Sequence, residues 1–299
     1  MRLYPGRWLL GMLVSVVLSG GWAAAAEADK PASVIAVQVK GTVEVQHGTA
    51  TTTEPVTDGT QLGQDDVVTT AAQSSVMLVL PSGSVVSLRE KSRLRIAVAL
   101  HSPAVGDTLA AGSTGGDEAP ETGASKTGFE LAFGQMLTRV RKLNPTSTFE
   151  VQTPVSVAAV RGTIFEVSYQ PDVAGEAQYQ LSTASGLVHV TPRGGNLVEV
   201  PADEQVDFSA EVGKQGVKIK QLKKARLERM KRDRLEKEGR DNDRNAGELV
   251  KKIQQARARA AEARENAAPN RITKPTTPAK PKVPSRVPAV KRPPRRPGT

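Results

Sequence analysis

Short runs of alternating apolar and polar residues fill most of the chain between Ser33 and about Ala210. Successive side chains of a β-strand point to opposite faces, so this alternation predicts strands that are buried on one face. Glycine, proline, aspartate and serine separate the runs and are typical of turns. The expected strands are residues 34–39, 42–46, 66–70, 76–80, 85–88, 93–99, 129–133, 135–140, 148–153, 155–160, 163–169, 177–183, 187–191, 197–200 and 205–208.

A loose internal repeat runs through these strands, because a glycine opens several of them. Glycine adopts positive φ without steric cost, so we expect a turn with positive φ at each of these positions. Repeated hairpins or coils of this kind build a β-sandwich or a short β-solenoid, and the repeat is too degenerate to separate the two. We predict an all-β domain over residues 33–212 with a flexible loop at 102–128. The repeated glycines are Gly41, Gly83, Gly134, Gly162 and Gly186.

The residue alphabet changes after the alternating region. Residues 217–238 are rich in lysine, arginine, glutamate and leucine, which are strong helix formers. Residues 239–245 contain glycine and asparagine and are expected to break this helix, and a second helix is expected at 246–267. Residues 214–267 are thus predicted to be a charged helical segment. Residues 268–299 alternate proline with lysine and arginine and are expected to be a disordered tail.

Charge is distributed unevenly along the chain. Residues 1–213 carry 14 basic and 22 acidic side chains, whereas residues 214–299 carry 27 basic and 9 acidic ones. An asymmetry of this kind bears on partners and location, not on fold. The chain has no cysteine, which excludes disulfides, cysteine-ligated metals, a thiol nucleophile and a lipidated cysteine after a leader.

The first residues have the features of a secretory signal peptide. Arg2 and Arg7 precede an apolar run from Trp8 to Leu18, and small residues follow as far as Ala26. The alternative is an uncleaved membrane anchor, but the unbroken apolar run falls short of the roughly 20 residues that span a bilayer. We expect cleavage near Ala26, a signal peptide over residues 1–26, and a periplasmic or exported protein.

Several blocks of the β-rich region together resemble the FecR protein domain, a family of bacterial periplasmic modules. The most specific block places Thr153 and Pro154 ahead of Arg161, Gly162, Thr163 and Phe165, and we expect these six motif residues to have structural roles. The other blocks, in the family's order, are residues 41–45, 58–84 and 131–136.

The resemblance implies a fold and a class of function. Members of the best-known kind pass a signal from an outer-membrane transporter to a cytoplasmic sigma factor, with an anti-sigma region, one transmembrane helix and the periplasmic domain. About seven residues precede the apolar leader here, so we expect no anti-sigma region of the chain's own. The part of the family plan that remains is an extracytoplasmic binding module.

The polar residues of the β region do not assemble into a recognisable reaction centre. Arg161 lies in an apolar strand pair, where an internal arginine that fixes a turn is favoured over a ligand contact. Asp65 and Asp66 are adjacent, so they point to opposite faces and suit a turn better than a shared catalytic site. Three isolated histidines lack metal-ligand spacing. We therefore predict no enzyme activity, no metal and no cofactor. The histidines are His47, His101 and His189.

The basic tail is either a solvated charge run or a site for anionic partners. It has no aromatic residue for base stacking, and export would separate it from the genome, so we expect no nucleic-acid partner. Anionic polysaccharides or lipid head groups of the envelope are the expected acidic partners. Self-association between the acidic domain and the basic tail is also open. The candidate tail residues are Lys274, Lys280, Lys282, Arg286, Lys291, Arg292, Arg295 and Arg296.

The sequence therefore predicts a non-catalytic binding protein of the bacterial cell envelope, with a protein or a polysaccharide as its partner. Two alternatives stay open. One is an accessory role in a FecR-type signalling relay, which would need a separate partner for the sigma-binding part. The other is an enzyme that processes envelope carbohydrate, which a single essential acid would reveal.

Overall fold

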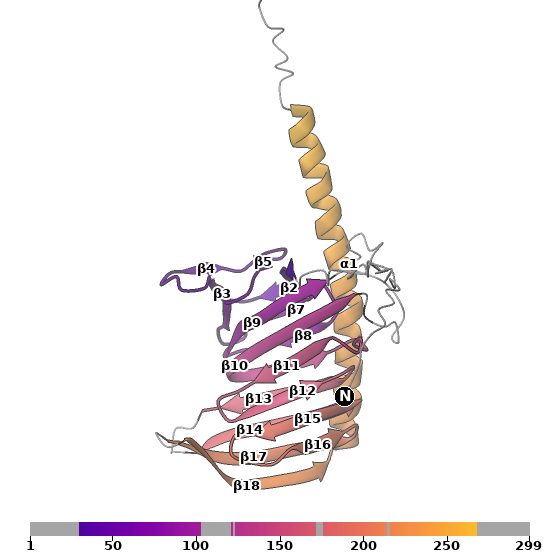
Figure 1. The fold of residues 1–299 in the computed structure, drawn as a ribbon. Coiled ribbons are helices and arrows are strands. Elements are labelled where there is room, and N and C mark those ends of the chain that lie inside the picture. Colours follow the sequence, from indigo (N-terminus) through magenta and orange to yellow (C-terminus); the bar gives the residue numbers. More distant parts are fainter. Residues whose placement is uncertain (1–29, 103–120, 122, 172–175, 214–215, 268–299) are drawn as a thin grey trace, which may run out of the picture. The chain divides into compact units, whose positions relative to one another are not determined.

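A computed structural model describes residues 30–102, 121, 123–171, 176–213 and 216–267 of the chain (Figure 1). The predicted leader (1–26), the tail (268–299) and its candidate residues lie outside these ranges. The chain divides after Gln255 into two compact units. The first unit contains all 18 described strands and most of the described helix.

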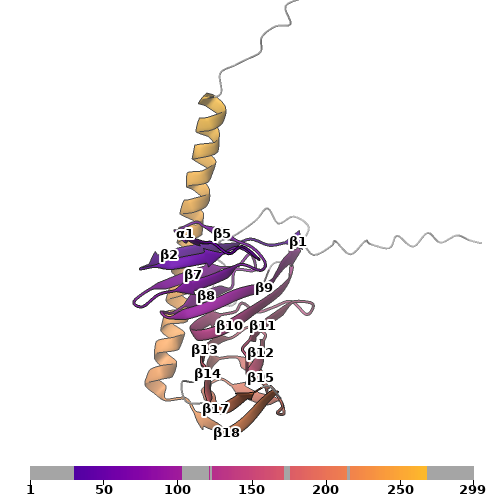
Figure 2. The same ribbon diagram turned by 90° about the vertical axis from the view of Figure 1, so that its left-hand side faces the viewer.

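The strands form two sheets that pack face to face (Figure 2). In sheet A each strand pairs with the next in a fixed order. That order is β4 (Thr53–Pro55), β3 (Val43–Gln46), β6 (Val67–Thr70), β9 (Ser92–Ser102), β10 (Ala124–Arg139), β11 (Thr148–Gln152), β12 (Ser156–Val160), β15 (Leu187–Pro192) and β16 (Val198–Pro201). The short strand β1 (Lys30–Pro31) also pairs with β9.

Sheet B is built in the same way, and β10 is the strand that the two sheets share. Its order is β5 (Gln61–Leu62), β2 (Val34–Lys40), β7 (Ser75–Val79), β8 (Val85–Leu88), β10, β13 (Ile164–Gln170), β14 (Ala177–Ser185), β17 (Glu204–Gly213) and β18 (Gly216–Arg226). From β11 onward the chain adds one hairpin to sheet A and the next to sheet B. The fold is thus a β-sandwich of stacked hairpins, and of its described pairs only β10–β11 is parallel.

The all-β prediction is confirmed, and every expected strand lies in an observed one, although β9, β10 and β17 extend three to five residues beyond the expected bounds. Residues 129–133 and 135–140 belong to one long strand, β10. The predicted loop at 102–128 is too long, because β9 continues to Ser102 and β10 begins at Ala124. The five repeated glycines all have positive φ, as expected: Gly41 (71°), Gly83 (80°), Gly134 (104°), Gly162 (85°) and Gly186 (83°).

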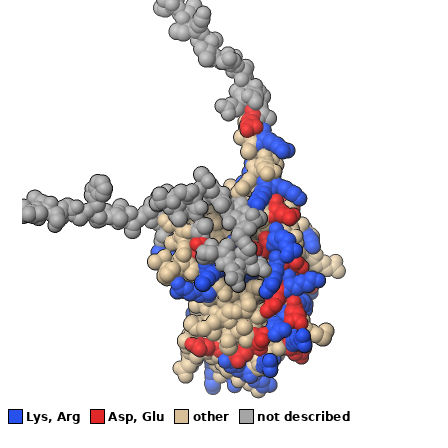
Figure 3. Space-filling model, turned by 90° about the vertical axis from the view of Figure 1, so that its right-hand side faces the viewer, with Lys and Arg blue, Asp and Glu red and all other residues tan. Residues whose placement is uncertain are grey.

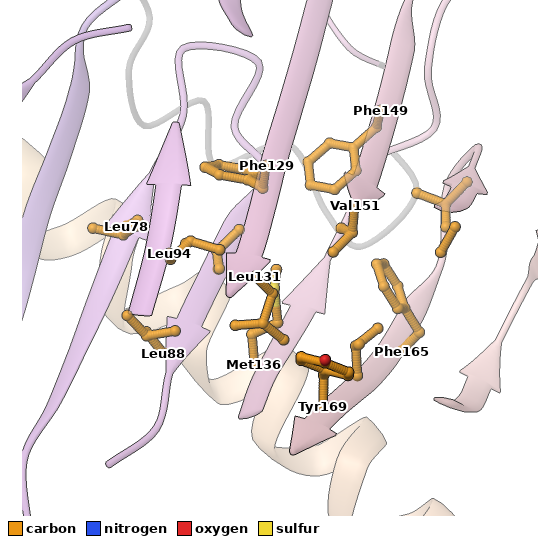
Figure 4. Close-up of a cluster of buried hydrophobic side chains, with 14 of the residues drawn as sticks. Leu78, Leu88, Leu94, Phe129, Leu131, Met136, Phe149, Val151, Phe165 and Tyr169 are labelled. Atoms are coloured by element: carbon orange, nitrogen blue, oxygen red, sulfur yellow. The ribbon is translucent and has the colours of Figure 1, made fainter. Parts of the chain in front are cut away.

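The core between the sheets consists of the inward side chains of the alternating strands (Figure 4). Aliphatic residues dominate it, and four of its aromatic residues form two ring pairs. The rings of Phe129 and Phe149 lie 5.8 Å apart, and those of Tyr179 and Phe208 stack at 4.5 Å. Burying a side chain of this size contributes about 1.5–3 kcal/mol, so the alternation seen in the sequence accounts for most of the driving force.

The prediction of a helix that starts at 217 is wrong, because residues 216–226 form β18, which pairs along its length with β17. Lysine alternates with Val217 and Ile219, and these two pack against the core. Ladder hydrogen bonds and this apolar contact outweigh the helix propensity of the lysines, which is a weak preference of tenths of a kcal/mol per residue.

One helix, α1 (Arg229–Ala267), follows β18 and runs without interruption through the predicted break at 239–245. The part of α1 from Leu235 to Val250 packs on the outer face of sheet B and forms a third layer (Figures 1 and 2). Gly239 permits the close approach, because a Cβ there would lie 2.9 Å from Cγ2 of Ile164. Packing against the sheet therefore explains both the continuity of the helix and the position of its glycine.

Two apolar clusters hold α1 against sheet B, and ion pairs lie between the two clusters. Leu235 packs with Leu137 and Ile164 at one end, and Ala246 and Val250 pack on sheet B at the other. The ion-pair partners are Arg89 with Glu238 (2.7 Å) and Glu166 (3.6 Å), and Asp243 with Arg139 and with Arg141 (3.6 Å).

Charge on the outer side of α1 is mixed. Figure 3 shows lysine and arginine side chains interspersed with aspartate and glutamate along it. No described helix combines the length and the apolarity that crossing a bilayer demands.

Candidate binding pocket on the open face of sheet A

No helix of the described residues covers the outer face of sheet A, and a pocket of about 420 Å³ opens on it. Its lining comes from strands that are neighbours in the sheet and from two turns. Outward residues of β6, β9, β10 and β11, together with the buried Leu131 of β10, form one part, and the turns after β11 and β15 form the other. The lining residues are Val67, Arg93, Arg95, Glu130, Leu131, Ala132, Gln152, Thr153, Pro154 and Arg193.

The pocket exists because β10 changes sheets at this point. Its pairing with β11 ends at Glu130 opposite Gln152, and its pairing with β13 in sheet B begins at Gly134 opposite Tyr169. Between these points β10 has no neighbour on the β11 side. A notch therefore opens in sheet A beside Leu131 and Ala132.

Gly134 makes this crossing possible. Its φ is +104°, and a Cβ at this position would lie 2.1 Å from Oγ of Ser92. That serine oxygen accepts a hydrogen bond from the backbone N–H of Gln135 at 3.0 Å. Any larger residue at 134 would separate these groups, so the glycine predicted to open a strand also sets the geometry of the pocket.

Arg95 has its charge neutralised by neighbouring carboxylates. Its Nε and NH2 atoms each donate to the carboxylate of Glu130 at 2.9 Å, and its NH1 donates to Asp65 at 3.1 Å. The hydrogen bond with Glu130 raises the pKa of Arg95, so the guanidinium stays charged and tied to its partner. Arg95 therefore forms a fixed wall of the pocket.

The other two arginines of the pocket have no carboxylate partner among the described residues. The NH2 of Arg93 donates to the neutral side-chain oxygen of Gln46 at 3.2 Å. The Nε of Arg193 makes a long contact of 3.5 Å with the backbone oxygen of Thr153. Two guanidinium groups thus keep most of their donors and their full charge for a bound anion.

The motif residues Thr153 and Pro154 form another wall of the pocket. Oγ1 of Thr153 is buried and accepts hydrogen bonds from the N–H groups of Val155 (3.3 Å) and Ser156 (3.0 Å), which fixes the turn. Pro154 is exposed on that turn. The N–H of Arg193 donates to the backbone oxygen of Val155 at 2.8 Å, so the same turn also positions this arginine.

The remaining motif residues lie away from the pocket. Gly162 and Thr163 form the turn before β13, with backbone bonds between Thr163 and Val140, and Phe165 is fully buried in the core. The expectation of an internal Arg161 is wrong. This side chain is exposed in the bend after β12 and makes no hydrogen bond or ion pair with the described residues, because the strand ends one residue earlier, at Val160.

The paired aspartates form a turn, as expected. Asp65 has a positive φ of 68°, and Oδ2 of Asp66 accepts from the N–H of Gly63 at 2.8 Å. His47 contacts Oδ1 of Asp66 at 2.9 Å, whereas His189 lies 3.7 Å from Glu199. Within the described residues, no three metal-ligating side chains gather.

The composition of the pocket suits binding better than bond-making. Its single acid, Glu130, is held by Arg95, and its single hydroxyl, on Thr153, is used inside a turn. Histidine and cysteine are absent from the lining. What remains is two guanidinium groups with no carboxylate partner among the described residues, beside an apolar floor, an arrangement that can hold a carboxylate or a phosphate.

The structure therefore defines a two-sheet β-domain with an arginine-lined pocket on its open face. Residues 66–189 match the family described as FecR protein, which confirms the resemblance over this range. The match runs from β6 into β15 and includes every pocket residue except Arg193. These residues are therefore similar to a FecR domain.

The fold was also compared with solved structures and with curated proteins. Two crystal structures of a proposed anti-sigma factor from Parabacteroides distasonis ATCC 8503 align with TM-scores of 0.37 and 0.36. Each is 18% identical, and each alignment covers 54% of this chain and 60% of the other. The chain thus spans less than two thirds of these relatives. No curated protein matches it.

Proposed function

We propose that this chain is a non-catalytic, extracytoplasmic binding protein that recognises a protein partner through the outer face of sheet A. One observation carries the proposal: α1 covers sheet B, whereas no described helix covers sheet A, whose pocket holds two arginines that have no carboxylate partner among the described residues. The family match supports a binding role, because the domain type is signalling-related. Export is part of the proposal and rests on the leader-like residues 1–26.

The proposal is tested with photo-reactive residues placed on the two sides of the sandwich in producing cells. Ala159 lies on the outer face of sheet A, and Arg244 is exposed on α1. We expect a discrete cross-linked species from position 159 and none of comparable yield from 244. Equal yields from both positions, or no adduct from 159, would contradict recognition through sheet A. Cell fractionation of the same samples tests export, and an unprocessed cytoplasmic protein would refute it.

A second proposal is an accessory role in a FecR-type relay, in which another chain supplies the sigma-binding part. The family match favours it. We expect the adduct from position 159 to contain an outer-membrane receptor or an anti-sigma protein. Mass spectrometry of the adduct decides this, and an adduct that contains neither would refute the relay while recognition through sheet A still holds.

For the basic tail we propose salt-sensitive association with anionic polysaccharide or lipid of the envelope. The excess of 27 basic over 9 acidic side chains in residues 214–299 supports it. Removing residues 268–299 is expected to reduce sedimentation with envelope fragments at low salt. Equal sedimentation of the full-length and the shortened protein would contradict it.

A further inference from the structure

The pocket of sheet A combines a cationic side with an apolar floor. Arg93 and Arg193 supply the charge, and Val67, Leu131 and Ala132 supply the floor. The pocket volume of about 420 Å³ falls in the range of ligand sites, which is roughly 300–1,000 Å³. A ligand that fits must carry a compact anion at the end of a short apolar stem.

Resting on the proposed function, we infer that the pocket binds a glutamate or aspartate side chain from an extended acidic segment of the partner protein. A carboxylate accepts paired N–H donors from a guanidinium, and its methylene stem lies against the apolar floor. The open face of sheet A leaves room for the residues on either side of the acid. The inferred site therefore recognises one acidic side chain within a short peptide segment.

The distribution of charge favours a single carboxylate over a more highly charged group. Arg95 is occupied by Glu130 and Asp65, so the pocket offers two free guanidinium groups, not three. Glu130 also places a negative charge at the wall. Arg93, Arg95 and Arg193 against Glu130 and Asp65 leave the site with a net charge of +1, which suits one carboxylate better than a dianionic phosphate or a run of adjacent acids.

The lining also favours a peptide over a polysaccharide. None of the ten lining residues is aromatic, so the pocket lacks the flat ring surfaces on which sugar rings stack. Neighbouring side chains in a strand alternate between the two faces, so an extended peptide can direct an acid into the pocket and leave its neighbours outside. A segment that alternates acidic and apolar residues meets both requirements.

The test uses the full-length protein and a fluorescent hexapeptide in which two glutamates alternate with valine and serine. Its twin has glutamine in place of both glutamates. We expect the glutamate peptide to bind measurably by fluorescence anisotropy, and to bind at least about tenfold tighter than the twin. Arg93→Gln and Arg193→Gln are each expected to weaken binding about tenfold or more. Arg161→Gln removes an exposed, unpaired arginine outside the pocket and is the matched control.

Three results would overturn the inference. The glutamine twin could bind as well as the glutamate peptide, or Arg161→Gln could weaken binding as much as the pocket variants. Inorganic phosphate could also displace the peptide better than butyrate, a single carboxylate on a short apolar stem, at equal concentration. Circular dichroism and thermal unfolding of each variant confirm that it is folded. If the peptide test fails but cross-links still form from position 159, the proposed function stands and only the carboxylate site is refuted. If no cross-links form from position 159, the proposed function itself is refuted.

Discussion

Replacing Leu235 tests whether α1 is an integral layer of the fold. Leu235 is fully buried and packs with Leu137, Ile164, Ala184 and Leu227 against sheet B. Leu235→Ala removes the largest apolar group that the first turns of α1 insert into this cluster. Buried leucine-to-alanine changes cost about 2–5 kcal/mol, because transfer energy is lost and a cavity remains. We expect about 3 kcal/mol here, because one side of the site is a helix that can move inward.

Thermal unfolding followed by circular dichroism measures this loss. For a domain of this size each kcal/mol lowers Tm by about 2–4 °C, so the expected fall is roughly 6–12 °C. Met230→Ala is the matched control, because Met230 is on the same helix and is 85% exposed. Its effect is expected to stay within about 0.5 kcal/mol.

Two outcomes would refute this reasoning. Equal and small shifts for Leu235→Ala and Met230→Ala would mean that α1 contributes little to the cooperative fold. An unchanged Tm combined with faster hydrogen exchange along α1 would mean that the helix unfolds separately from the sandwich.

The surroundings of three single residues give three further predictions. Gly247→Ala is expected to stabilise the protein by about 0.5–1 kcal/mol, because nothing lies within 4 Å of the added Cβ. Gly239→Leu is expected to destabilise it by about 1–3 kcal/mol through overlap with Ile164, and urea unfolding compares the two variants. Burial raises the pKa of the Tyr179 hydroxyl, so the folded protein retains a proton that the unfolded chain releases above about pH 10. Stability should therefore fall as the pH rises above about 10, and less so in Tyr179→Phe; an equal fall in both would contradict this.

The strands could be predicted from the sequence because their signal is local. Period-two alternation marks a half-buried strand, and the five glycines mark turns whose positive φ few other residues tolerate. The division into two sheets could not be predicted in this way. It depends on the change of β10 from one sheet to the other at Gly134, and a strand interrupted by glycine is indistinguishable in sequence from two strands.

The segment after Gly213 was mispredicted because tertiary contacts override local preference there. The lysine-rich residues of β18 favour a helix in isolation, yet Val217 and Ile219 sit two residues apart and pack inward. That spacing was a strand signal within the charged sequence. The expected break at Gly239 was misplaced for a related reason, since only the docked structure reveals that the glycine faces Ile164.

The pocket was only partly foreseeable. Arg93 and Arg95 alternate with inward Leu94, so their outward position is visible in the sequence. The contribution of Arg193 is not, because this residue reaches the pocket through its backbone bond to Val155. The motif pointed to Thr153 and Pro154 but suggested a structural role alone.

The crossing strand has a mechanical consequence for the whole sandwich. Ala132 of β10 lines the pocket, and Arg139 of the same strand is ion-paired with Asp243 of α1. Seven residues of extended backbone, about 23 Å at ~3.3 Å each, separate the two positions. A continuous covalent segment therefore joins the exposed side of one sheet to the helix-bearing side of the other. A displacement of Ala132 would reach Arg139 along the peptide backbone itself, and the Arg139–Asp243 ion pair then links that strand to α1.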